Sequence, residues 1–455
     1  MKNVIKKAWP LVVAAVLAVA LLIFYGVTLS GDNNPGITEE NLADGATVYG
    51  SAGAGMAFDS GRMTAWNVSE KGAEAVVDFG QEREINALLL NETGYNVKQF
   101  SVYYENGGEW ELCYRQCEIG VDRLATFYPV TTKKIKVVID DFKNTVRISD
   151  IAVYNLQARE NNDFRVSTYI RPEHIGQGLI DPDCFDIVTD VQFIAYGNFD
   201  PEGNVVPVEG ADEALKGLKD MIGNRDVSIT VTVFPVREGA TMADVYREHM
   251  DNAVQSIVNL VEELDVDGAD FDWEYPHGSE EWALYSEFIV RLGEELHKTG
   301  KELSIALSPW GVNLSQEAID SIDQLQLMSY DMFDYKGDNN SYSGAAACAA
   351  EYFISCGFAP GQLNLGISFY GRPNDGSGVW VNYSDENYTQ DEYIMYQNGV
   401  WFNTVTTVRD KTAYAALRGL GGIMIFSQDE DLPVSDPLSL TAQIGKAIDM
   451  FVKEA

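Results

Sequence analysis

The sequence has 455 residues, of which 46% are hydrophobic and 22% are charged, so it describes a globular protein of two or three domains and excludes a disordered chain. With 69 acidic and 32 basic residues, the formal charge is -37. Because this charge repels phosphates and anionic membrane surfaces, we expect no nucleic acid partner.

The N-terminus has the features of a membrane-targeting segment. Lys2, Lys6 and Lys7 precede an apolar run over residues 8–29, and we expect residues 1–30 to form a signal-anchor or a signal peptide. The run is as long as a membrane span, which favours an uncleaved anchor over a cleaved peptide, and both alternatives stay open. Since the basic flank stays inside in either case, we expect the remaining chain to be extracytoplasmic, anchored at the cell surface or secreted if cleaved.

A polar linker over residues 31–37 leads to a region of short strands at 38–157. Runs such as INALLLNE, VKQFSVYYE and KKIKVVIDD are separated by turn signals, which predicts an all-β sandwich. Trp66 and Tyr95 are candidates for stacking on a sugar, but buried sandwich aromatics explain them at least as well.

Several runs of this region carry a resemblance to a known domain type. NLADGATVYG, AFDSGRMTAW, AEAVVDFGQEREINALLL and VRISDIAVYNL resemble the discoidin, or factor V/VIII type C, domain, a galactose-binding-like jelly roll that often binds carbohydrate. The resemblance implies a structural calcium near Asp44 and Asp59. The five cysteines do not form a pattern typical of a zinc site or a disulfide scaffold, and no metal site is predicted from them.

After a charged connection at 158–163, strand-like runs alternate with long amphipathic helical patterns. The runs are FRVSTYI, VQFIAYGNF, VSITVTVF, VDGADFDWE, LSIALSP, LQLMSYD, LNLGISFYG and GGIMIFS. Eight strands alternating with helices predict that residues 164–455 form a TIM, or (β/α)8, barrel, whose active site lies at the C-terminal ends of the strands.

The fourth of these runs continues to Pro276 and carries three carboxyl groups at alternate positions. Asp270, Asp272 and Glu274 share one face because successive strand side chains point to opposite sides. Alone, this pattern is also typical of a solvated strand face. In a barrel it points into the mouth, where neighbouring carboxyl groups cannot all ionise and one can act as a general acid.

Four runs of the barrel region resemble glycoside hydrolase family 18, the chitinase and endo-β-N-acetylglucosaminidase family. They are DGADFDWEYP, MSYD at 328–331, SFYGR at 368–372 and GLGGIMIFSQDED at 419–431. The resemblance implies substrate-assisted retaining catalysis through an oxazolinium intermediate, with no cofactor. Glu274 would be the acid, Asp272 would orient the acetamido group, Asp270 would share a proton or hydrogen bond with Asp272, and Tyr330 would contact the acetamido group.

Substrate contacts are expected from side chains near the ends of several strands. The candidates are Asp331, Met328, Trp310, Trp380, Tyr370, Arg372, Phe426 and Tyr196. For the two tryptophans, packing is an equal alternative. Phe426 stands where chitinases commonly place a tryptophan, and the segment 373–411 is shorter than the insertion of deep-cleft members, so we expect an open groove.

The implied substrate is chitin or a chitooligosaccharide with β-1,4-linked N-acetylglucosamine. An endo-β-N-acetylglucosaminidase acting on N-glycans, a non-catalytic chitinase-like lectin and a peptidoglycan hydrolase are the alternatives. The lectin is disfavoured because members of that kind typically lose the acid, and Glu274 is present.

Overall fold

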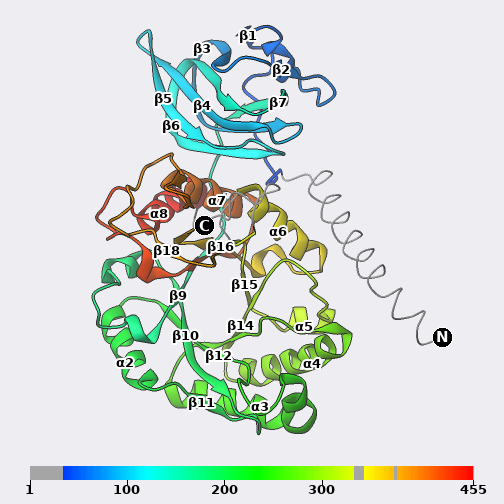
Figure 1. The fold of residues 1–455 in the computed structure, drawn as a ribbon, viewed down its shortest axis with the longest axis vertical. Helices are drawn as coiled ribbons and strands as arrows, with labels where there is room; N and C mark the ends of the chain where they lie inside the picture. Colours follow the sequence, from blue (N-terminus) through cyan, green and yellow to red (C-terminus); the bar gives the residue numbers. More distant parts are fainter. Residues whose placement is uncertain (1–33, 333–342, 374–376, 454–455) are drawn as a thin grey trace, which may run out of the picture.

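The computed structural model describes residues 34–332, 343–373 and 377–453, which form an all-β domain followed by a barrel (Figure 1). The predicted targeting segment at 1–30 lies outside the described residues. Within the described ranges, no helix combines the length and the apolar character needed to cross a membrane.

The first domain is an antiparallel sheet that folds over its own core. Its strands are β1 Thr47–Gly50, β2 Trp66–Val68, β3 Ala73–Glu92, β4 Val97–Asn106, β5 Glu109–Gln116, β6 Arg123–Phe142 and β7 Val146–Tyr154, in the order β2-β7-β3-β6-β4-β5 with β1 on β3. Register irregularities along β3 and β6 bend these long strands. Trp66 is 0% exposed, so its role is packing, as the core alternative predicted.

Eight parallel strands close the barrel and confirm the predicted runs. They are β9 Arg165–Ile170, β10 Asp190–Phe199, β12 Ser228–Phe234, β13 Gly268–Asp272, β14 Glu302–Leu307, β15 Gln324–Leu327, β16 Leu363–Ser368 and β21 Gly422–Phe426. Each pairs with the next, and β21 and β10 both pair with β9. The acidic strand is thus the fourth strand of a closed barrel, and the solvated-face alternative is excluded for Asp270 and Asp272, which are buried.

Helices surround the barrel. They are α2 Ala211–Ile222, α3 Met242–Leu264, α4 Gly278–His297, α5 Gln316–Asp320, α6 Ser343–Ser355, α7 Val405–Arg418 and α8 Leu440–Phe451. Phe271 and Trp273 point outward between α3 and α4, where Trp273 contacts the rings of Tyr246 and Tyr285. This outward packing leaves the other face of β13 to the interior of the barrel.

Short elements complete the chain. They are β8 Arg159–Glu160 paired with β22 Val452–Lys453, β11 Val205–Pro207 on β10, and the 3-10 helices η1 Ala54–Ala57, η2 Pro172–His174, η3 Pro182–Asp186, η4 Pro360–Gln362 and η5 Gln428–Glu430. A second, small sheet has the order β18-β17-β20-β19 and consists of β17 Tyr370–Pro373, β18 Val381–Asn382, β19 Tyr396–Gln397 and β20 Val400–Trp401. We call it the small sheet.

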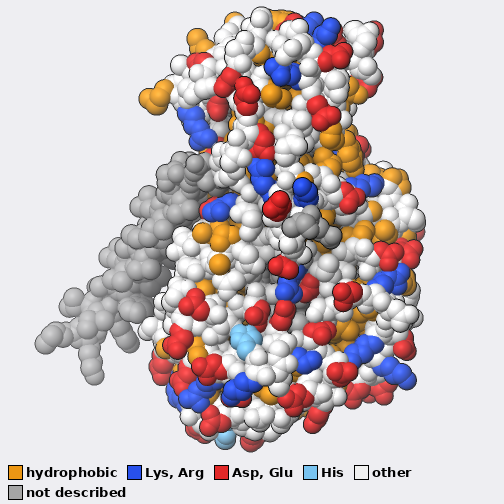
Figure 2. Space-filling model, turned by 180° about the vertical axis from the view of Figure 1, so that it is seen from behind, with side chains coloured by type: hydrophobic (Ala, Val, Ile, Leu, Met, Phe, Trp, Pro, Cys, Tyr) orange, Lys and Arg blue, Asp and Glu red, His pale blue; other side chains and the backbone are white. Residues whose placement is uncertain are grey.

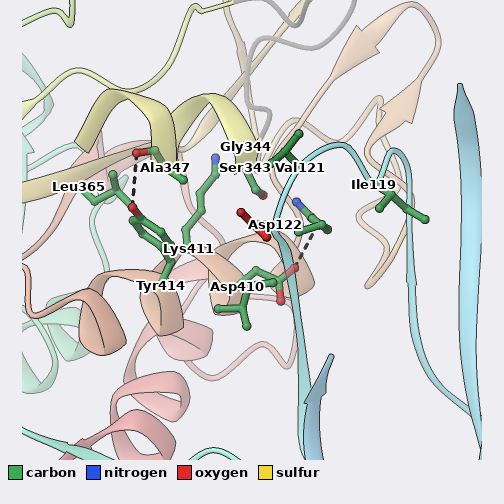
Figure 3. A pocket seen from close by; sticks show the side chains of 12 residues that line it. Ile119, Val121, Asp122, Ser343, Gly344, Ala347, Leu365, Asp410, Lys411 and Tyr414 are labelled. Carbon is green, nitrogen blue, oxygen red and sulfur yellow. Dashed lines mark hydrogen bonds and ion pairs between the residues drawn. The ribbon is translucent and has the colours of Figure 1, made fainter. Parts of the chain in front are cut away.

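The two domains share a buried polar interface, where α7 of the barrel lies against the sandwich (Figures 1 and 3). Asp410 on α7 is 2% exposed and accepts hydrogen bonds from the Tyr114 hydroxyl at 2.7 Å and from Arg123 at 3.1 Å. Its other oxygen accepts from the backbone N–H and the hydroxyl of Thr126 at 2.8 and 2.7 Å. All four donors belong to the sandwich, so this Asp410 cluster joins the domains directly.

Candidate active site

A cavity of about 260 Å³ opens at the C-terminal ends of the barrel strands. We call it the mouth cavity. The residues that line it are Tyr169, Ile194, Phe234, Asp272, Glu274, Tyr275, Ala306, Ser308, Trp310, Met328, Tyr330, Asp331, Tyr370, Trp380 and Phe426. The cavity therefore brings together most of the predicted site residues. They are Asp272, Glu274, Tyr330, Asp331, Met328, Trp310, Tyr370, Trp380 and Phe426.

Asp270 lies below this cavity and is completely buried. Its carboxylate accepts hydrogen bonds from Thr232 at 2.9 Å and from the Tyr169 hydroxyl at 3.1 Å. Burial raises the pKa of Asp270, and the hydroxyls of Ser304, Thr232 and Tyr169 act in the opposite direction. Asp270 Oδ1 is buried without a hydrogen-bond partner among the described residues, as is Asp272 Oδ1, and the shared proton or hydrogen bond between the two groups stays a prediction.

Asp272 occupies the end of β13, between Asp270 and Glu274. It is 6% exposed, and its Oδ1 atom is buried without a hydrogen-bond partner among the described residues. Burial raises its pKa well above the ordinary value, and the negative charges of Glu274 and Asp270 raise it further. Glu274 follows the strand and is exposed at the mouth. The site thus has an accessible carboxyl group above a buried one that lacks a partner.

Tyr330 and Asp331 follow β15 on the other side of the cavity. The Tyr330 side chain is 8% exposed, lines the cavity and lies against Phe426, with ring centroids 5.9 Å apart. Asp331 accepts a hydrogen bond from the Tyr370 hydroxyl at 2.9 Å and another from Arg372. Arg372 is therefore a support for Asp331 and is not among the residues that line the cavity.

Two tryptophans extend the aromatic wall. Trp310 is 49% exposed and Trp380 is 42% exposed, and both line the cavity. Trp380 stacks on Tyr370 and stands perpendicular to Phe426, at 88° and a centroid distance of 5.7 Å. Neither indole is buried in the core, which favours the predicted sugar-stacking role over packing.

Tyr196 does not reach the cavity, and its prediction as a substrate contact is wrong. Its ring is buried and its hydroxyl donates to Asp212 on α2 at 2.6 Å. The pairing of β10 with β12 is irregular between Phe193 and Gly197. This irregularity breaks the alternation of sides, so Ile194 lines the cavity and Tyr196 points to a helix.

Sequence reasoning missed Tyr169, Tyr275 and Ser308. Tyr169 on β9 supports Asp270, and its place on the inward side of the first strand was a signal that could have found it. The Tyr275 hydroxyl and the Ser308 hydroxyl are 2.8 Å apart beside Glu274. Ser308 follows β14 and could have been found only from the register between neighbouring strands.

The calcium expected at the loops around Asp44 and Asp59 stays a prediction. Asp44 accepts hydrogen bonds from Asn41 and Ser60, and Asp59 accepts from Thr64. Calcium requires six to eight oxygen ligands, with several carboxylates commonly among them. In the part of the chain that the structure describes, no group of three or more His, Cys, Asp or Glu side chains could hold a metal ion. Within the described residues, the five cysteines form no disulfide.

Comparison with known families defines the class of both domains. Residues 226–431 match the model of the glycosyl hydrolases family 18, and residues 37–168 match the model of the F5/8 type C domain. The barrel is a chitinase-like glycoside hydrolase domain of family 18, and the sandwich in front of it is a discoidin-like domain. Both predicted resemblances are confirmed.

Individual relatives are distant. The chain is 24% identical to a putative chitinase 1 of Margaritifera margaritifera, with 58% of this chain and 68% of that protein covered. It is 26% identical to chitotriosidase-1 of Mus musculus, with 39% of this chain and 52% of that protein covered. A family 18 chitinase of Flavobacterium johnsoniae has a TM-score of 0.53 at 23% identity, with 63% of this chain and 94% of that chain covered. For a group IV chitinase of Ostrinia furnacalis in complex with allosamidin, the TM-score is 0.54 at 21% identity, with 64% and 100% covered. The structural likeness shows a shared fold.

Proposed function

We propose that the protein is a retaining glycoside hydrolase that cleaves β-1,4-linked N-acetylglucosamine in chitin or chitooligosaccharides. The observation that carries this proposal is the Asp272 carboxyl group, which is buried between two other carboxyl groups and has an oxygen without a partner. A buried acceptor without a donor is costly, and the N–H of a 2-acetamido group would satisfy it. Chitinase relatives agree with this substrate class.

In this mechanism the substrate supplies the nucleophile. Glu274 donates its proton to the glycosidic oxygen as the bond from that oxygen to the anomeric carbon breaks, and the acetamido carbonyl oxygen forms a new bond to the same carbon. The resulting oxazolinium ion is positive, and Asp272, which would share its proton with Asp270, stabilises it with the negative charge that the pair carries. Glu274 then accepts a proton from water, which attacks the anomeric carbon and opens the ring. Two inversions give net retention.

The decisive experiment compares hydrolysis of a fluorogenic N,N'-diacetylchitobioside with release of glycans from a high-mannose glycoprotein. We expect the native chain to cleave the chitobioside and Glu274→Gln to lose about 10²- to 10⁴-fold in kcat, because a general acid contributes that much. Glu294→Gln, at an exposed position on α4, is the matched control and should keep full activity. Cleavage of the glycoprotein alone would assign the N-glycan activity, and cleavage of neither would favour a lectin.

We further propose that the protein works outside the cytoplasm and that its sandwich binds carbohydrate. The basic and apolar segment at 1–30 supports the first proposal, and the discoidin-like domain supports the second. Protease digestion of intact cells tests the location, and the N-terminal sequence of the mature protein distinguishes an anchor from a cleaved peptide. Calcium binding in the sandwich stays a prediction that calorimetry on the full chain can test.

A further inference from the structure

A groove of about 560 Å³ lies between the sandwich and the small sheet, away from the mouth cavity. Lys98, Gln99 and Arg115 of the sandwich form one wall, and Tyr396 and Trp401 of the small sheet form the other. Figure 2 shows hydrophobic side chains gathered at the junction of the two domains. We call this the interdomain groove.

The wall from the small sheet is an aromatic pair. Tyr396 on β19 and Trp401 on β20 are cross-strand partners with ring centroids 4.8 Å apart. Tyr396 is 52% exposed, although large apolar side chains are normally buried. The two strands that hold the pair are each two residues long. Exposed aromatic rings of this kind offer a flat surface to the C–H face of a sugar ring.

The opposite wall carries polar groups that suit sugar hydroxyl and amide groups. The Arg115 Nε atom donates to Ser101 Oγ at 2.9 Å, which fixes the direction of the guanidinium group. Gln99 adds both a donor and an acceptor. Asp141 also lines this wall, so that positive and negative groups lie side by side and the wall does not select for a strongly charged ligand.

The small sheet connects this groove to the mouth cavity. Tyr370, at the start of β17, lines the cavity, and Arg372 on the same strand pairs with Trp401 of β20. Two residues along β17 and two steps across the sheet place Tyr396 about 12 Å from Tyr370, from ordinary strand dimensions. A glycan of a few sugar residues covers that distance.

The walls are held at a fixed spacing by contacts between the domains. The Asp410 cluster joins α7 to β5 and β6, and Gln116 donates to Thr404 at 3.1 Å beside the groove. Cys117 Sγ lies 3.4 Å from Met395 Sδ, and both residues line the groove. Because both walls are positioned before a ligand arrives, binding does not have to order them.

We propose that the interdomain groove binds the same glycan chain that the barrel cleaves, at sugar residues several positions away from the bond beside Glu274. The ligand is a neutral chain rich in N-acetylglucosamine, and this inference rests on the proposed function. The sandwich then helps to hold substrate directly, through the wall with Gln99 and Arg115, in addition to any site of its own.

The test compares a short and a long substrate on the full chain. Tyr396→Ala should raise KM for N-acetylchitohexaose about three- to tenfold more than KM for the diacetylchitobioside, because only the longer chain reaches the groove. Tyr49→Ala is the matched control, since Tyr49 is a 47% exposed tyrosine on β1 outside both sites and should leave both KM values unchanged. An equal change for both substrates, or no change for the hexaose, would overturn the inference.

A binding measurement tests this inference independently of the proposed function. Calorimetry with N-acetylchitohexaose on Glu274→Gln, with and without Tyr396→Ala, measures the groove without cleavage. Loss of affinity on removing Tyr396 supports the groove even if the native chain cleaves neither test substrate. Affinity for the hexaose that is independent of Tyr396, or tighter Tyr396-dependent binding of a polyanionic glycan, counts against the neutral chain.

Discussion

The indole of Trp380 lies parallel to the phenol ring of Tyr370, with ring centroids 4.6 Å apart and an angle of 11° between the planes. Tyr370 is in turn held by its hydrogen bond to Asp331. Both rings contact Phe426. Phe426 is the residue that stands where chitinases commonly have a tryptophan. A side chain from the small-sheet region therefore supplies the indole that the eighth strand lacks.

This arrangement predicts the effect of removing the indole. Trp380→Ala should raise KM for the diacetylchitobioside about tenfold, because a stacked ring contributes about 1 kcal/mol beyond the area that it buries. Trp380→Phe should restore part of the affinity. Steady-state kinetics check both, and an unchanged KM for Trp380→Ala would return this side chain to a packing role.

A second prediction concerns the buried carboxyl group. Asp272→Asn keeps the size of the side chain but removes the negative charge that would stabilise the oxazolinium ion, so we expect kcat to fall about 10²- to 10³-fold. Circular dichroism serves as the control for folding. A kcat within threefold of the native value would contradict the role assigned to Asp272.

The Asp410 cluster leads to a prediction for stability. Asp410→Ala leaves Arg123, Tyr114 and Thr126 with buried donors that have lost their acceptor. Breaking a buried ion pair from one side costs about 3–5 kcal/mol in the free energy of unfolding. Denaturant unfolding measures it, with the exposed Asp449→Ala on α8 as control. A loss below about 1 kcal/mol would mean that the interface relaxes around the missing group.

Lys411 gives a prediction for pH dependence (Figure 3). Its side chain is 2% exposed and its Nζ atom donates to Asn403 at 2.8 Å. Burial lowers its pKa from 10.5 to about 7; the charge of Arg123 lowers it further, and that of Asp410 acts in the opposite direction.

Between pH 7 and 10.5 the unfolded chain therefore binds more protons at this lysine than the folded chain does. The contribution of Lys411 to the free energy of unfolding should rise with pH across this window, by at most about 1.4 kcal/mol per pH unit. In Lys411→Met that rise should be absent. Unfolding curves of both proteins at several pH values in this window check it, and parallel pH profiles would be the contrary result.

The barrel could be predicted from the sequence because its strands are short buried runs between amphipathic helices. The position of the acidic face followed from the same count, since Asp270 and Asp272 keep the alternation of a regular strand. The predicted direction of the Tyr196 side chain was wrong because the pairing of β10 with β12 is irregular beside it. The local sequence does not mark that irregularity. Periodicity locates side chains only where the strand is regular.

The interface between the domains was not predicted for a different reason. Arg409, Asp410 and Lys411 are three consecutive charged residues on α7, a pattern typical of a solvated helix face, yet all three are buried. They are covered by another domain whose partners lie some 280 residues earlier in the chain. Pairings of this range become visible only when both domains are placed in space.

Donors on β5 and β6 converge on one acceptor, and that acceptor belongs to the neighbouring domain. A sandwich transplanted onto a different enzyme would bring Tyr114, Arg123 and Thr126 without the carboxylate that they hold. A barrel expressed alone would present the carboxylate without its donors. We therefore expect the two domains to be inherited together, with exchange of Asp410 in a descendant lineage accompanied by exchange of Arg123.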